Sequence, residues 1–183
     1  SDNWVPAAAP DSKGNVWIGW DSYETGNFDV FVRRLSADGR LGERRQVTRS
    51  SAFDANVSLA CDRNDRLWLA WDTAEPNWGK DWTSQHFRPE GGNGLYKTRA
   101  VRVACLDGDR LLEPQGSVMD AIPAAWRDYF QSARLQPDTS GRIWLMGRSL
   151  TSFRTRVQNN WGAGGLWEVV LTKLDEGGWT PAV

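Results

Sequence analysis

Arginine, carboxylate and indole side chains concentrate in two long polar segments, 72–94 and 148–165. A guanidinium grips a carboxylate or phosphate through two parallel hydrogen bonds, and an indole offers a flat apolar face on which a sugar ring can stack. The groups that we select as candidate ligand-binding residues are Asp72, Trp78, Lys80, Asp81, Arg88, Arg148, Arg154 and Trp161. The alternative stays open that the charges form ion pairs between loops and that the indoles pack the loops onto the sheet beneath.

Catalytic and metal-binding signatures are weak. His86 is the single histidine, so a zinc site that needs two histidines is excluded within one chain, and no nucleophile motif accompanies it. Asp72 and Asp81 could act as a carboxylate pair in glycoside hydrolysis only at a defined separation. A calcium ion on loop carboxylates is conceivable, but no calcium-loop motif is present. The sequence therefore leaves the catalytic residues unknown and predicts no metal site and no cofactor.

The overall composition excludes several classes of partner. Lys and Arg number 22 and Asp and Glu number 23, which gives a net charge of -1 and no basic surface for nucleic acid. No apolar run is long enough to span a membrane. The 12 Trp and 18 Gly are typical of strands that pack large flat side chains and turn tightly.

A short sequence unit recurs three times, and the strands that it builds must position the candidate binding residues. It reads Asp, two polar residues, Gly, a polar residue, an aliphatic residue and Trp, and its copies start at residues 11, 62 and 138. Its members are Asp11, Gly14 and Trp17, then Asp62 and Trp68, then Asp138, Gly141 and Trp144. Asp opens a tight turn by binding its own backbone. The Gly position, which is Asp65 in the second copy, is expected to have a positive φ.

The five residues after each turn are expected to form a strand that is apolar on both faces, with Val16, Ile18 and Trp20 pointing one way and Trp17 and Gly19 the other. Such a strand is covered on both sides, as it is when sheets stack face to face around an axis. A shorter strand precedes each turn, and a longer third strand and a short outer strand follow.

Four strands repeated three times predict an all-β protein made of three four-stranded antiparallel blades of a β-propeller, rather than a β-sandwich with coincidental turns. The predicted parts of the single domain are blade 1 (1–50), blade 2 (51–115), a connection (116–130) and blade 3 (131–183).

The repeat resembles the blade motif of bacterial propellers with six or seven blades. It is similar to the Asp-box of sialidases, but there the Gly follows the Asp by two positions and not by three. A nearer likeness, carried by Trp71-Asp72, 77–81, Leu95-Tyr96 and 141–145, is to the propeller region of uncharacterised exported bacterial proteins, some of which continue into a hydrolase-like domain. The resemblance implies an exported, extracellular or periplasmic module of a larger protein.

Three blades form an incomplete ring, because propellers have four to eight. The expected partners are therefore the remaining blades of a longer protein, in a ring of about six, or a second copy of the chain. The long segments 72–94, 115–130 and 148–165 all fall on one face, where propeller loops commonly carry function. In the connection, Pro123 to Phe130 is expected to make a short helix with Pro in its first turn.

Cys61 and Cys105 are expected in the first and third strands of one blade. Two strand spacings are roughly 9–10 Å, which exceeds the roughly 7 Å that a disulfide can bridge. Two free, buried thiols are therefore predicted.

Three functions remain open from the sequence. The first is a non-catalytic module that recognises a carbohydrate, an anionic small molecule or a partner domain through the loop-rich face. The second is part of a propeller hydrolase or lyase, in which the carboxylates and arginines of that face do acid–base work. The third is a purely structural spacer.

Overall fold

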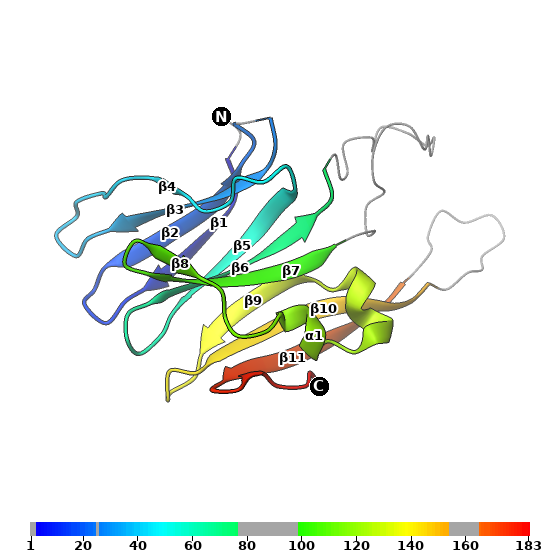
Figure 1. Cartoon of the computed structure of the whole chain (residues 1–183). Coiled ribbons are helices and arrows are strands. Elements are labelled where there is room, and N and C mark those ends of the chain that lie inside the picture. The colour runs from blue at the N-terminus through cyan, green and yellow to red at the C-terminus, as the bar shows by residue number, and fades with distance from the viewer. Residues whose placement is uncertain (1–2, 25, 77–98, 154–164) are drawn as a thin grey trace.

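The computed structural model describes residues 3–24, 26–76, 99–153 and 165–183, and these form three four-stranded antiparallel sheets, each made of consecutive strands (Figure 1). Blade 1 contains β1 (Asn3–Pro10), β2 (Val16–Ser22), β3 (Asp29–Leu35) and β4 (Arg45–Gln46). Blade 2 contains β5 (Phe53–Cys61), β6 (Leu67–Ala74), β7 (Ala100–Asp107) and β8 (Arg110–Leu112). Blade 3 contains β9 (Gln131–Pro137), β10 (Ile143–Phe153), β11 (Gly165–Asp175) and β12 (Gly178–Trp179).

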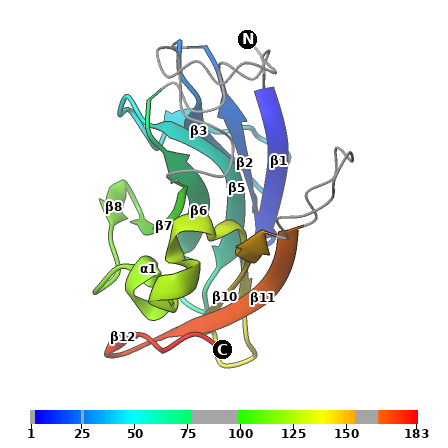
Figure 2. The same cartoon turned by 90° about the vertical axis from the view of Figure 1, so that its right-hand side faces the viewer.

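The sheets stack as successive blades. The first strands adjoin, because β5 contacts β1 on one side and β9 on the other. The chain then runs outward through each sheet to β4, β8 or β12. Viewed at right angles to Figure 1, the outer strands β8 and β12 lie on the side of the molecule away from β1 (Figure 2). The all-β architecture of three propeller blades is therefore confirmed.

The three Asp turns have the predicted construction. In each, the Asp Oδ1 accepts hydrogen bonds from the backbone N–H groups two and four residues later, at 2.8–3.1 Å. Gly14, Asp65 and Gly141 have positive φ values of 77°, 60° and 79°. The indole Nε1 six residues after Asp62 and Asp138 donates to the other oxygen, at 3.0 and 3.1 Å.

Blade 1 closes its turn in a different way. There, Arg34 donates to Asp11 at 2.8 Å, and the guanidinium lies over the ring of Trp17.

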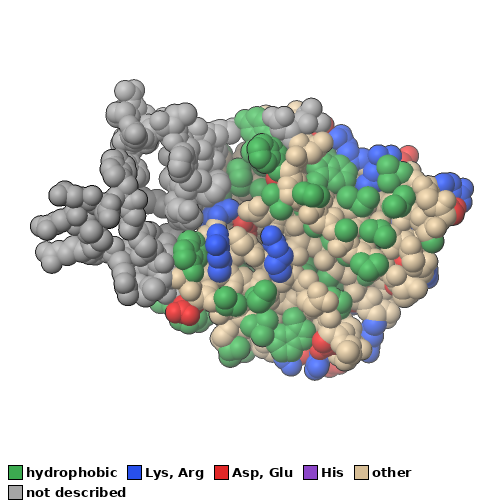
Figure 3. All heavy atoms as spheres, turned by 180° about the vertical axis from the view of Figure 1, so that it is seen from behind, with side chains coloured by type: hydrophobic (Ala, Val, Ile, Leu, Met, Phe, Trp, Pro, Cys, Tyr) green, Lys and Arg blue, Asp and Glu red, His purple; other side chains and the backbone are tan. Residues whose placement is uncertain are grey.

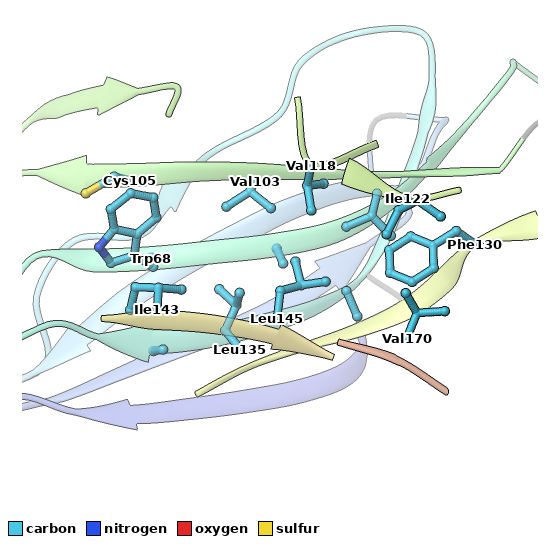
Figure 4. Packing of buried hydrophobic residues seen from close by; sticks show 14 residues of the cluster. Trp68, Val103, Cys105, Val118, Ile122, Phe130, Leu135, Ile143, Leu145 and Val170 are labelled. Atoms are coloured by element: carbon cyan, nitrogen blue, oxygen red, sulfur yellow. The ribbon is translucent and has the colours of Figure 1, made fainter. Parts of the chain in front are cut away.

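Two apolar clusters fill the spaces between blades, and β6 contributes to both. Leu67, Leu69 and Trp71 pack against blade 1, whereas Trp68 and Ala70 pack against blade 3. Figure 4 shows the second cluster, where the Trp68 ring lies near Cys105 and Ile143. The middle strand of blade 2 is therefore covered on both faces, as its sequence predicts.

The connection between blades 2 and 3 forms two short helical segments, α1 (Val118–Ala121) and the 3₁₀ helix η1 (Ala124–Tyr129). The prediction of one short helix missed α1, which Ser117 caps by accepting from the N–H of Met119. Pro123 precedes η1 as its N-cap and does not lie in the first turn. The two segments place Val118, Ile122 and Phe130 in the second cluster (Figure 4).

Both cysteines are free thiols on β5 and β7 of one blade, with β6 between them. Cys105 is buried, but Cys61 is only half-buried, so the prediction of two buried thiols is wrong for Cys61. Cys61 is the last residue of β5, and its thiol lies 4.0 Å from the carbonyl oxygen of Ala9 in blade 1. Burial raises the pKa of each thiol to about 11.

Phe130 fills a space that blade 3 leaves open. Gly147 stands at the register position that Trp20 and Trp71 occupy in the other blades. A Cβ on Gly147 would clash with the Phe130 ring, which is fully buried.

We therefore expect Gly147→Ala to lower the free energy of unfolding by about 1–3 kcal/mol, because overpacking forces the ring from its site. The matched control is Gly177→Ala, whose Cβ would meet nothing within 4 Å. Urea denaturation measures both variants. Equal stabilities would contradict the placement of Phe130.

Candidate functional site

The described long-loop end of the propeller is where β2, β6 and β10 finish and where α1 and η1 lie, opposite the Asp turns (Figure 1). A set of polar side chains gathers at this end between the blades. We call it the inner polar cluster, and it consists of Asp21, Asn56, Asp72, Arg99 and Ser132.

Each blade supplies a bulge to this end. In blades 2 and 3 the first strand slips its register at Asn56 and Ser132, and both residues have φ of 57°. The bulge turns a backbone N–H away from its own sheet, toward the preceding blade. A carboxylate at the end of that blade's second strand accepts it: Asp21 from Asn56 at 3.0 Å, and Asp72 from Ser132 at 2.8 Å.

Asp72 is the most heavily used member of the cluster. Besides the Ser132 N–H, it accepts from the Asn56 side-chain amide at 2.8 Å and from Arg99 at 3.1 Å. The Asp72 and Arg99 side chains are 1% and 9% exposed. Burial raises the pKa of Asp72, and the Arg99 charge and the two hydrogen bonds oppose that rise. Both oxygens are thus engaged by protein donors, which makes Asp72 a clamp between blades.

Asp21 is the equivalent residue of blade 1. Its carboxylate accepts from the N–H of Asn56 and from its own backbone N–H, and no cation pairs with it among the described residues. It is 2% exposed. Burial raises its pKa from 3.8 to about 6, with a further contribution from the negative charge of Asp72, against the hydrogen bond from Asn56. Among the described residues, the two equivalent carboxylates therefore differ: Asp72 is ion-paired and Asp21 is not.

The raised pKa of Asp21 makes stability depend on pH. The folded state binds this proton more tightly than the unfolded chain, so the free energy of unfolding falls as pH rises from about 4 to about 6 and is level above that. Two pKa units correspond to about 3 kcal/mol. Asp21→Asn removes the charge and keeps an acceptor for Asn56.

We expect this variant to gain stability relative to the native chain as pH rises through that window. Urea titrations between pH 4 and 8 measure the difference, and a difference that stays constant with pH would contradict the assignment.

A second polar group, not foreseen from the sequence, lies where blades 1 and 2 meet, beside the hydrogen bond from the Asp54 N–H to the Phe28 carbonyl oxygen at 3.0 Å. Trp71 donates its indole N–H to Asp54 at 3.0 Å, and burial raises the pKa of Asp54. Nearby, Thr48 donates to Asp29 at 3.0 Å and accepts from the N–H of Val30 at 2.9 Å. Nothing in the repeat marks these residues, because their partners lie in different strands.

Arg148 occupies in blade 3 the position of Asp21 and Asp72. It is exposed, and its guanidinium carbon lies 4.5 Å from the centre of the Trp167 ring. The structure thus separates the two described candidates: Asp72 is sealed between blades, and Arg148 faces outward. The other candidates, Trp78, Lys80, Asp81, Arg88, Arg154 and Trp161, lie outside the described residues.

The opposite, hairpin end carries an open groove of about 650 Å³ between the turns of blades 2 and 3. Arg63, Arg66, Trp68, Arg142 and Glu176 are among its lining residues. Within the described ranges, no three His, Cys, Asp or Glu side chains are placed to hold a metal ion. The helices described here are all too short to cross a membrane.

Comparison with known proteins adds information on the fold. No protein-family model and no curated protein match the chain. Among solved structures, an endo-1,4-beta-xylanase from Bacteroides thetaiotaomicron VPI-5482 matches at 12% identity with a TM-score of 0.56, over 97% of this chain and 57% of that one. An alpha-L-arabinofuranosidase from Lactobacillus brevis matches at 7% identity with a TM-score of 0.59, over 99% of this chain and 55% of that one.

The likeness is one of fold. At these identities it carries no residue assignments, and the chain spans little more than half the length of either structure.

Asp21, Asp72 and Arg148 each follow the Trp of their repeat unit by four residues, but their partners Asn56 and Ser132 were not foreseen from the sequence. A bulge is one extra residue in a strand, and nothing in the local pattern announces it.

Proposed function

We propose that this chain is a non-catalytic carbohydrate-recognition module of a larger exported propeller protein and that it binds through its long-loop end. One observation carries the proposal. Asp72, the one described carboxylate among the candidate binding residues, is 1% exposed with both oxygens engaged, whereas Arg148 at the equivalent position is exposed beside Trp167.

The Arg148–Trp167 pair has the chemistry of a sugar site. The indole supplies a flat apolar surface for a pyranose or furanose ring, and the guanidinium supplies fixed donors for hydroxyl or carboxylate oxygens. The names of the two matching structures, a xylanase and an arabinofuranosidase, support a carbohydrate as the ligand class. Their greater length supports a larger parent protein, and the resemblance to exported bacterial proteins supports export.

A second candidate, part of a carbohydrate hydrolase, is favoured by those same two names and by Asp21. A carboxyl with a pKa of about 6 suits a general acid. In that function Asp21 and not Asp72 would donate the proton.

The experiment is affinity electrophoresis in gels that contain xylan or arabinan. We expect retardation of the native chain and at least tenfold weaker binding for Arg148→Ala and for Trp167→Ala. The control is Arg40→Ala at the hairpin end, where the Arg40 side chain is 86% exposed. Absence of retardation, or equal weakening by the control, would refute the proposal. Release of reducing sugar that Asp21→Asn abolishes would establish the hydrolase function in its place.

A further inference from the structure

The face of blade 1 that points away from blade 2 is built like an inter-blade surface. In blades 2 and 3 the residues at the start of the second strand that face the preceding blade are fully covered: Leu67 and Leu69 are 0% exposed, and Leu145 is 0% exposed. The equivalent residues of blade 1, Val16 and Ile18, are apolar as well but only half-buried. Blade 1 thus has the apolar residues that pack against a preceding blade in blades 2 and 3, but here they are only half-buried.

The backbone of blade 1 also has the bulge that takes part in the contacts between blades. Its first strand slips register between Trp4 and Ala7, at the place where blades 2 and 3 have Asn56 and Ser132. Val5 stands in that bulge with φ of 37°. A β-branched residue with positive φ is a rare and costly conformation. In the other two blades this conformation presents an N–H to a carboxylate from the preceding blade.

We propose that a further four-stranded blade packs on this face of blade 1 and carries an Asp at the end of its second strand, whose carboxylate accepts the hydrogen bond of the Val5 N–H. Its facing positions hold small residues, as the two described interfaces do. Blade 1 presents Ala9, Gly19 and Val32 to blade 2, and blade 2 presents Ala60, Ala70 and Val103 to blade 3. Leu59, for example, lies directly against Gly19.

A second copy of this chain does not have that chemistry. The outward face of blade 3 has Arg148 where the occupant needs Asp, and a guanidinium has no acceptor for an N–H. The same face has Arg134 and Gln136 where blade 2 has Ser58 and Ala60. All three side chains are exposed. The occupant is therefore a different blade, outside residues 1–183.

Grafting the surface of blade 2 onto blade 3 supplies a probe with the required chemistry. The variant carries Arg134→Ser, Gln136→Ala and Arg148→Asp, all at exposed positions where substitutions change stability by about 0.5 kcal/mol or less. Sedimentation is expected to show association at least tenfold tighter than that of the native chain. Adding Ile18→Glu, or using Arg148→Ala instead of Arg148→Asp, should abolish the association.

Three results would overturn the proposal. The first is that the grafted variant, folded by circular dichroism, does not associate. The second is that its association survives Ile18→Glu. The third is that the native chain already associates and loses association on Ile18→Glu, which would make a second copy the occupant.

Amide exchange on the unmodified chain is the second measurement. The Val5 N–H should exchange at least tenfold faster than the Ser132 N–H, and it should slow in the grafted variant. Equal protection of both amides in the unmodified chain would show that Val5 already has an acceptor.

Discussion

Replacing Asp72 with alanine is expected to lower the free energy of unfolding by about 3–5 kcal/mol, because it removes one member of a buried, hydrogen-bonded ion pair. Arg99 is 9% exposed and would lose its ion pair. The Ser132 N–H and the Asn56 amide would each lose an acceptor in the same step. These donors belong to blade 2, to blade 3 and to the segment before β7. Their loss therefore weakens the contact between blades 2 and 3.

The matched control is Asp38→Ala. Asp38 also forms an ion pair with an arginine, Arg40, but both side chains are largely exposed at a hairpin turn. Exposed pairs contribute about 0–1 kcal/mol, so this variant should remain close to the native chain in urea denaturation. A loss at Asp72 no greater than the loss at Asp38 would contradict the role of Asp72 as a clamp.

The second large effect is expected for Trp68→Ala, at about 3–5 kcal/mol. The Trp68 side chain is 6% exposed and packs in the cluster between blades 2 and 3 (Figure 4). Its indole also donates to Asp62 at 3.0 Å. The substitution therefore opens a cavity at the interface between blades 2 and 3, with one wall formed by each blade.

Trp144→Ala is the matched comparison, because Trp144 holds the same repeat position and donates to Asp138 at 3.1 Å. Trp144 lies on the outward face of blade 3 and is only half-buried. Its loss should cost at least 1 kcal/mol less, since a half-covered ring has less burial to lose. Thermal and urea denaturation of the two variants give the difference. Equal costs would mean that Trp68 is not covered by blade 3.

Hydrophobic side chains are also visible on the surface of the described part of the molecule. Seen from the side opposite to Figure 1, the described surface carries many separate hydrophobic side chains with Lys and Arg between them and at the edge (Figure 3). Met146 and Val169, on the outward side of blade 3, are 48% and 67% exposed. The outer blades thus keep residue types that the inner contacts bury.

The elements that local sequence dictates were predictable. Asp62 and Asp138 bind backbone groups two and four residues away, so each turn can be recognised from a stretch of seven residues. Successive residues of β6 point to opposite faces of the sheet, and both faces are covered. This assignment follows from the two-residue period of a strand alone. Because both signals recur three times, the number and order of blades followed from them.

The contacts that join blades could not be predicted in the same way. Asn56 binds Asp21 across 35 residues of chain, and Ser132 binds Asp72 across 60. The pairing of Phe130 with Gly147 depends on a helical connection that no repeat specifies. For the candidate site, the repeat places Asp72 and Arg148 at equivalent positions, four residues after Trp68 and Trp144. It could not show that one is sealed between blades and the other open to solvent.

The central claim is that successive blades are joined by a carboxylate that accepts the N–H of the next blade's bulge. Backbone amide exchange by NMR on the native chain tests this claim most directly. We expect the Asn56 and Ser132 amides to exchange at least 100-fold more slowly than the amide of Gly177 in its open turn, a difference of about 2.7 kcal/mol in protection. Exchange of Asn56 and Ser132 at the rate of Gly177 would contradict it.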